Sequence, residues 1–167
     1  AESRAIWNLL CDVSRIEFQK VYDLLGVNLT EVGESFYNPL IPGAIELCQK
    51  AGIVENEENM LIIKLPHFTI PLIVRKSDGG YGYDSTDLAA IHYRLHEKKA
   101  DWLIYITDGG QAPHFHMIFD AAKAAGWVKT NAKGNGPALG GSDMGLAPGT
   151  HRLDHVGFGV VCGDDGK

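Results

Sequence analysis

The chain has 167 residues, of which 45% are apolar and 22% charged, and its net charge is −6 at neutral pH. This composition is typical of a globular protein, and the length is enough for one domain with a substantial core. The sequence has a negative net charge and no cluster of basic residues of the kind that binds nucleic acid. No apolar run approaches the length of a membrane span. We therefore expect neither DNA nor a membrane among its partners.

Three cysteines, Cys11, Cys48 and Cys162, lie far apart in the sequence. An odd number of cysteines without a CxxC pair supports neither a disulfide framework nor a zinc site. We predict that they are buried free thiols of a protein that resides in a reducing compartment.

Apolar residues recur at helical spacing from Ala5 to Ile16, which predicts a helix near the start of the chain. Ser14 and Glu17 have the spacing of a capping box, so a helix is predicted to restart there. Gly26 is predicted to end this helix after residue 25.

Residues 29–33 predict a short strand, and residues 42–51 predict a helix with a proline near its first turn. Two apolar, β-branched runs follow at 60–65 and 71–75. We interpret them as two strands joined by a turn, which together form a small β-hairpin.

The loop at residues 77–87 is rich in glycine, aromatic and acidic residues. It lies between a predicted strand at 70–75 and a predicted helix at 86–99. A second strand, predicted at 102–107, runs into the sequence DGGQ at 108–111 and then into another helix. Open α/β sheets bind ligands at the carboxyl ends of their strands, so the two loops predict one site.

From residue 70 onward the predicted order of strand, helix, strand, helix, strand is typical of a parallel sheet. The predicted fold class is α/β, with part of a doubly wound, Rossmann-like parallel sheet and a small β-hairpin insertion. Residues 103–106 are apolar on both faces, which predicts helices on both sides of this strand. Residues 1–128 and 151–167 are assigned to this domain. Residues 129–150 hold six glycines and are predicted to be a flexible insertion.

Tyr83 and Asp87 share one face of the predicted helix with Ala90 and Arg94. They therefore meet at the start of that helix, next to Gln111 if the two strands are neighbours. A carboxylate in the first turn is favoured by the helix dipole whether or not it binds a ligand. The residues alone leave both interpretations of Asp87 open.

Three long runs carry a family resemblance: KSDGGYGYDSTDLAAIHYRL at 76–95, KADWLIYITDGGQAPHF at 99–115 and HVGFGVVCGDDGK at 155–167. In order and spacing they resemble the catalytic domain of eukaryotic-type arginyl-tRNA synthetases, which are class I aminoacyl-tRNA synthetases. The resemblance covers nearly the whole chain except 129–150. It implies a fragment of a class I catalytic domain.

The resemblance implies that Tyr83, Asp87, Gln111 and Glu34 bind L-arginine, with Glu34 matched through its Gly-Glu-Ser context. The chemistry is consistent with that ligand. A guanidinium presents a planar fork of donors, which carboxylates accept in bidentate geometry. The Tyr83 ring offers a cation–π contact, and the Gln111 amide can both donate and accept.

For ATP, the resemblance implies contacts from His114 to the phosphates and from His155, Gly157 and Phe158 to the adenosine. Small residues in the last strand would allow a close approach of the nucleotide to the backbone. A glycine-containing core strand is the competing interpretation of this segment, and it stays open for His155.

The implied reaction activates L-arginine with ATP, accompanied by Mg²⁺, and transfers it to tRNA(Arg) in the cytoplasm. Such chemistry depends on positioning and charge stabilisation, so no catalytic nucleophile is assigned to this chain. The family's His-x-Gly-His tetrapeptide, its lysine-rich loop and its anticodon-binding domain are missing from the sequence. We therefore expect this fragment to be inactive alone, with tRNA bound mainly by other regions.

Other interpretations stay open beside the enzyme. The chain is alternatively a non-catalytic arginine-sensing or protein-binding paralogue, or a structural remnant in which Tyr83, Asp87 and Gln111 fail to converge. A synthetase for another amino acid is less consistent with paired acidic groups. His92 and His96 have the spacing of metal ligands, but we interpret them as exposed histidines and assign no metal site.

Overall fold

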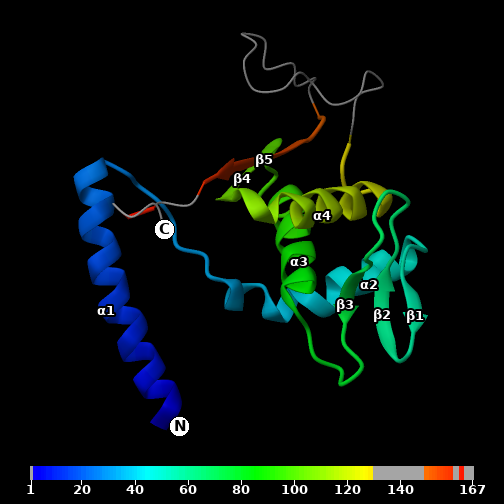
Figure 1. The fold of residues 1–167 in the computed structure, drawn as a ribbon, viewed down its shortest axis with the longest axis horizontal. Helices are drawn as coiled ribbons and strands as arrows, with labels where there is room; N and C mark the ends of the chain where they lie inside the picture. Colours follow the sequence, from blue (N-terminus) through cyan, green and yellow to red (C-terminus); the bar gives the residue numbers. More distant parts are fainter. Residues whose placement is uncertain (1, 130–148, 160–161, 164–167) are drawn as a thin grey trace. The chain divides into compact units, whose positions relative to one another are not determined.

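The computed structural model describes residues 2–129, 149–159 and 162–163. These residues form two compact units, 1–33 and 34–167, each of which is considered by itself (Figure 1). Most of the predicted insertion at 129–150 lies outside the described residues. Its flexibility, and the division of the chain around it, therefore stay predictions.

The first unit consists of α1 (Glu2–Leu25) and the segment that follows it. Gly26 ends the helix as predicted, at a φ of +66°, a backbone conformation that glycine adopts without strain. The amide of Val27 donates to the carbonyl of Tyr22 at 2.9 Å, which closes the helix end.

Two predictions for the first unit are wrong. No helix restarts at Ser14, because its hydroxyl donates to the Leu10 carbonyl at 3.0 Å inside the continuous helix α1. Residues 29–33 form no strand; all of them are exposed. A strand is stable only beside a hydrogen-bonded neighbour, which this segment lacks within the described part of the chain.

The second unit contains the remaining elements. In chain order they are η1 (Glu34–Phe36), η2 (Asn38–Leu40), α2 (Ile41–Lys50), β1 (Glu55–Glu57), β2 (Met60–Ile63), β3 (Leu72–Arg75), α3 (Tyr83–His96), β4 (Trp102–Asp108), η3 (Gly109–Gln111), α4 (Ala112–Ala124) and β5 (Arg152–Phe158).

The strands form two sheets. In one, β1, β2 and β3 lie in that order and are antiparallel, which confirms the predicted hairpin of β2 and β3 and adds β1, whose exposed ENE sequence gave no strand signal. In the other, β4 and β5 are parallel, from Trp102 opposite Arg152 to Asp108 opposite Phe158. The α/β class with a small hairpin is therefore confirmed. Strand β3, which precedes α3, pairs with β2 and not with β4, so it is not part of the parallel sheet that was expected from residue 70 onward.

Helix α4 packs against the β4–β5 pair, and α3 packs against α2, α4 and β3 (Figure 1). On β4, Leu103 and Tyr105 point into the core, whereas Ile104 and Ile106 are 46% and 66% exposed. The prediction that helices cover both faces of this strand is therefore wrong for the described residues. Strand β4 is apolar on both faces, but only the face with Leu103 and Tyr105 is buried in the core.

A single apolar core fills the second unit. The prediction that the cysteines are buried is correct for Cys48 but wrong for Cys11, which is half-buried, and for Cys162, which is exposed. Burial raises the pKa of the Cys48 thiol to about 12. The largest fully buried apolar side chains are Ile41, Ile62, Ile63, Leu72, Leu88, Ile91, Leu95 and Ile118.

His92 and His96 are half-buried rather than exposed, which corrects their prediction. Their rings lie 4.5 Å apart, and the ring of His92 meets that of Trp127 edge-on at 4.9 Å. Burial lowers the pKa of both imidazoles, which favours their neutral forms. These two residues therefore contribute to packing at the end of α3.

Candidate functional site

A cavity of about 540 Å³ lies in the second unit, where the start of α3 meets η3 and the start of α4. Its lining includes all four residues predicted to bind arginine, so Tyr83, Asp87 and Gln111 converge and the condition for a structural remnant is not met. The lining residues are Glu34, Tyr83, Asp87, Gly110, Gln111, His114 and Phe115.

Helix α3 begins three residues earlier than predicted, and this changes which carboxylate lies at its N-terminus. Gly82 is its extended N-cap, and the Ser85 hydroxyl donates to the Val74 carbonyl at 2.8 Å, which ties the first turn to β3. Asp84, and not Asp87, therefore lies in the first turn, where the helix dipole favours a negative charge. The dipole explanation that competed for Asp87 thus applies better to Asp84.

His114 lies between two carboxylates. Its Nε2 is 2.7 Å from Oδ2 of Asp87, and its Nδ1 is 3.5 Å from Oδ1 of Asp84. The ring of Tyr83 meets the imidazole edge-on at 5.0 Å. The cavity therefore combines acidic groups, an aromatic ring and one histidine.

Asp84 is the most enclosed carboxylate of this group. Its Oδ2 accepts a hydrogen bond from the Ile73 amide at 2.8 Å, which connects α3 to β3. Burial raises the pKa of this carboxyl above its ordinary value, although the Ile73 hydrogen bond and the nearby His114 oppose the shift. The contact with Ile73 thus fixes the side chain of Asp84, which is more buried than Asp87 and is not among the residues that line the cavity.

Gln111 is placed by a tight turn at the end of β4. The Asp108 carboxylate accepts a hydrogen bond from the Gly110 amide at 2.8 Å, and Gln111 then caps α4. A Cβ atom at Gly110 would lie 2.8 Å from Oδ1 of Asp108, so a larger residue there would displace this carboxylate from its hydrogen bond. The DGGQ sequence is therefore a geometric unit that brings Gln111 to the cavity.

Glu34 is held through its neighbours Phe36 and Tyr37. Tyr37 is buried, and its hydroxyl accepts a hydrogen bond from Nη2 of Arg94 at 3.3 Å. The Arg94 guanidinium lies 5.6 Å from the centre of the Tyr37 ring and 5.1 Å from that of Tyr105. Arg94 therefore connects the segment that carries Glu34 to α3 and β4.

The residues predicted to contact ATP do not line one common cavity. His114 lines the same cavity as Asp87, whereas His155 lines another cavity, of about 410 Å³, with His67, His116 and Asp154 among its neighbours. Nε2 of His155 is 2.8 Å from the Thr107 hydroxyl, and its ring stacks on Phe115.

Gly157 has a packing role within the chain itself. A Cβ atom there would lie 2.8 Å from the Cα of Gly109, so the two glycines allow β5 to approach the turn that carries Gln111. Phe158, at the end of β5, is exposed. A contact of any of these residues with ATP stays a prediction.

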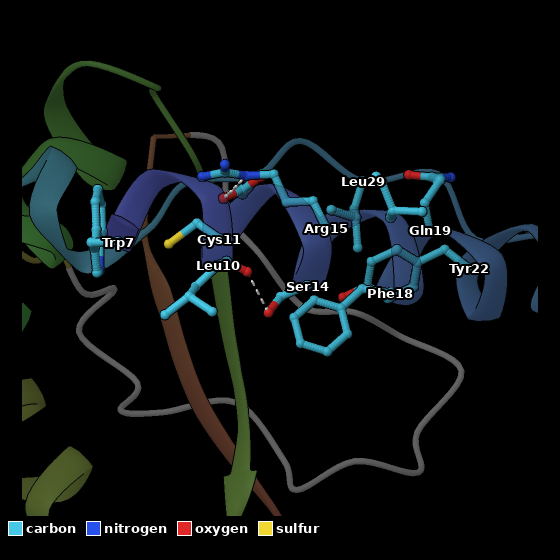
Figure 2. A pocket seen from close by; sticks show the side chains of 11 residues that line it. Trp7, Leu10, Cys11, Ser14, Arg15, Phe18, Gln19, Tyr22 and Leu29 are labelled. Carbon is cyan, nitrogen blue, oxygen red and sulfur yellow. Dashed lines mark hydrogen bonds and ion pairs between the residues drawn. The ribbon is translucent and has the colours of Figure 1, made fainter. Parts of the chain in front are cut away.

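The first unit has its own groove, of about 810 Å³, along α1 and the segment after it (Figure 2). Apolar side chains such as Trp7, Leu10 and Phe18 dominate its lining, and Arg15 forms an ion pair with Glu31 at 2.8 Å. None of the predicted site residues lines this groove, so it is not the site indicated by the sequence.

Two residues of the site were not predicted from sequence. Asp84 was assigned to a loop, although its position three residues before Asp87 would place both on one face of a longer helix. Arg94 was placed on the correct helix face, but its contact with Tyr37 spans 57 positions in the chain, and no local pattern reports such a contact.

The described residues contain neither a candidate metal site nor a candidate membrane-spanning helix. Within them, no group of three or more histidine, cysteine, aspartate or glutamate side chains is arranged to hold a metal ion. No helix in the same ranges has both the length and the apolar character that crossing a bilayer would require.

Comparison with known proteins is consistent with the site chemistry. The family model of the class I tRNA synthetase (R) catalytic domain matches residues 1–137. The chloroplastic/mitochondrial arginine–tRNA ligase of Arabidopsis thaliana is 51% identical over 98% of this chain and 23% of its own length. The arginine–tRNA ligase of Thermosynechococcus vestitus is 45% identical over 99% of this chain and 26% of its own, so the resemblance is not limited to eukaryotic proteins.

A solved structure gives the same result. The arginyl-tRNA synthetase of Plasmodium falciparum aligns with a TM-score of 0.74 and 36% identity over 93% of this chain and 24% of its own. The chain thus spans about a quarter of the length of the relatives that it matches. The chain belongs to the family of class I arginyl-tRNA synthetase catalytic domains, and it corresponds to a fragment of such a protein.

Proposed function

We propose that this chain forms much of the L-arginine pocket of an arginine–tRNA ligase. In the whole protein, ATP activates L-arginine to arginyl-adenylate, and the arginyl group is then transferred to tRNA(Arg). The names of the relatives support this activity, and the cavity at the start of α3 supports the part that this chain contributes.

The observation that carries the proposal is the set of side chains around this cavity. Glu34 from η1, Tyr83 and Asp87 from α3, and Gln111 from η3 all line it. Two carboxylates, an aromatic ring and an amide match a guanidinium, which needs acceptors and a π face. Among the described residues that line it, His114 is the only one with a basic side chain that could repel a cation.

The remaining partners are proposed for the whole protein. ATP would be a substrate, accompanied by Mg²⁺, and His114, His155, Gly157 and Phe158 stay its candidate contacts in this chain. The described lining of the arginine cavity includes no lysine or arginine to stabilise a pyrophosphate leaving group, which is consistent with an inactive isolated fragment. The matched relatives include chloroplastic/mitochondrial and cytoplasmic proteins, and we propose the cytoplasm for this one.

Calorimetric titration of the 167-residue chain tests the pocket. We expect L-arginine to bind, and citrulline to bind at least about tenfold more weakly, because it keeps the shape of arginine but lacks the charge that the carboxylates recognise. L-lysine is expected to bind weakly as well, since its ammonium cannot make a bidentate contact. Equal affinity for arginine and citrulline would contradict a charge-selective pocket.

A further inference from the structure

We propose that Asp84 and His114 are positioning residues that fix the carboxylate of Asp87 for recognition of the guanidinium. The proposal rests on the proposed arginine pocket and assigns a role to two residues that are not among its four predicted contacts. It also gives His114 a function at the arginine side of the site, in addition to its proposed contact with ATP.

The three side chains form a continuous series of contacts across three elements. The Ile73 amide of β3 donates to Oδ2 of Asp84 at 2.8 Å, and Oδ1 of the same carboxylate is 3.5 Å from Nδ1 of His114. Nε2 of His114 is 2.7 Å from Oδ2 of Asp87. The series starts at a backbone group that cannot rotate and ends at the cavity, so it restricts the rotamer of Asp87.

The exposed fraction of the side chains increases along this series, from Asp84 through His114 to Asp87. The side chains of Asp84 and His114 are 17% and 18% exposed, whereas that of Asp87 is 27% exposed. His114 occupies only Oδ2 of Asp87, and Asp87 lines the cavity. A carboxylate held in this way loses little conformational entropy when a ligand binds, and such preorganisation favours affinity and selectivity.

The side chains around His114 restrict rotation of its imidazole ring. The Tyr83 ring lies 5.0 Å away on one side and the Phe115 ring 5.2 Å away, both edge-on. Glu34 lines the same cavity. Both ring nitrogens face carboxylates, so the imidazole can donate to Asp84, to Asp87 or, when doubly protonated, to both.

Asp84 also has a purely structural explanation, since it lies in the first turn of α3 and accepts the Ile73 amide. The substitution Asp84→Asn separates the two roles. The asparagine side chain keeps an oxygen for the Ile73 amide but presents an NH₂ group to His114, so the structural contact survives while the contact with His114 is inverted.

The first test measures L-arginine affinity by calorimetry in the 167-residue chain. We expect D84N and H114N each to weaken binding about tenfold, while the double variant is no weaker than about twentyfold because both act through one series of contacts. The matched controls D120N and H116N remove the same groups elsewhere on α4 and are expected to stay within about twofold. Affinities of D84N and H114N within twofold of the wild type would overturn the proposal.

The second test does not require arginine, and so distinguishes failure of this inference from failure of the pocket. The ¹⁵N chemical shifts of the His114 ring report which nitrogen carries the proton. We expect D84N to move the Nδ1 shift towards the value of an unprotonated nitrogen, because an NH₂ group at the position of Oδ1 can donate to Nδ1 but cannot accept from it. Unchanged ring shifts in D84N would overturn the positioning role even if the wild-type chain binds arginine. If D84N fails to fold, loss of affinity in H114N, which leaves the Ile73 contact intact, carries the test.

Discussion

Replacement of Asp87 by asparagine is expected to weaken L-arginine binding on the order of 100-fold, which corresponds to about 3 kcal/mol. Asp87 lines the cavity and lies 2.7 Å from His114. Its loss removes a charge-assisted contact to the guanidinium and replaces the carboxylate that His114 contacts with a neutral amide. Calorimetry on the purified variant would measure the effect.

The control for Asp87 is D101N, which removes an exposed carboxylate just before β4. Removal of this charge is expected to change arginine affinity by less than about twofold, because exposed charges contribute little at this range. If D87N and D101N bind arginine equally well, Asp87 is not part of the pocket. Any binding of arginine would then be due to the overall negative charge of the chain.

Substitution of Gly157 by alanine is expected to cost about 2 to 3 kcal/mol of unfolding free energy. The new Cβ would lie 2.8 Å from the Cα of Gly109, a backbone atom that cannot rotate away. Either β5 or the turn of η3 must shift, and a shift of that turn would move Gln111. Urea denaturation measures the first effect, and a weaker arginine affinity of the folded variant would report the second.

Gly159 offers the matched control two residues along the chain, since a Cβ atom there would meet nothing within 4 Å. G159A is therefore expected to unfold within about 0.5 kcal/mol of the wild type. Equal unfolding free energies for G157A and G159A would show that the close approach of β5 to η3 is not required.

Local patterns predicted the elements that carry the site. Helical spacing, the glycines and the apolar strand at 102–107 indicated the elements that carry Tyr83, Asp87 and Gln111, because these signals are local. The convergence of the three side chains depends on the packing of α3 against α4, since β3 and β4 lie in different sheets. Glu34 is 49 positions from Tyr83, and only the family resemblance connected it to the cavity. Its position depends on the packing of Tyr37 and Arg94.

The errors have different physical origins. Ser14 was expected to cap a helix, but its hydroxyl bonds one turn back within α1. Residues 72–75 were expected in the parallel sheet, but β3 pairs with β2 because a hairpin is closed by neighbours in sequence. Ile104 and Ile106 were expected to be covered, yet composition alone does not report what lies above a sheet face.

The pairing of His114 with Asp84 and Asp87 illustrates the same limit at the site. His114 is on α4 and lies 27 positions or more from the two aspartates, which are both on α3. Their distances depend on how α3 packs against α4, which is set by the core as a whole. Sequence analysis therefore predicted side chains that line one cavity, whereas the contacts between them required the structure.

Mapping of L-arginine on the ¹⁵N-labelled chain by chemical-shift perturbation tests the central claim most directly, because it locates the ligand. Saturating L-arginine is expected to perturb the amides around Glu34, Tyr83, Asp87 and Gln111, and to leave the α1 groove around Leu10 and Phe18 unchanged. Citrulline at the same concentration is expected to give little perturbation. Perturbations confined to the α1 groove, or the same pattern with citrulline, would contradict an arginine pocket at the start of α3.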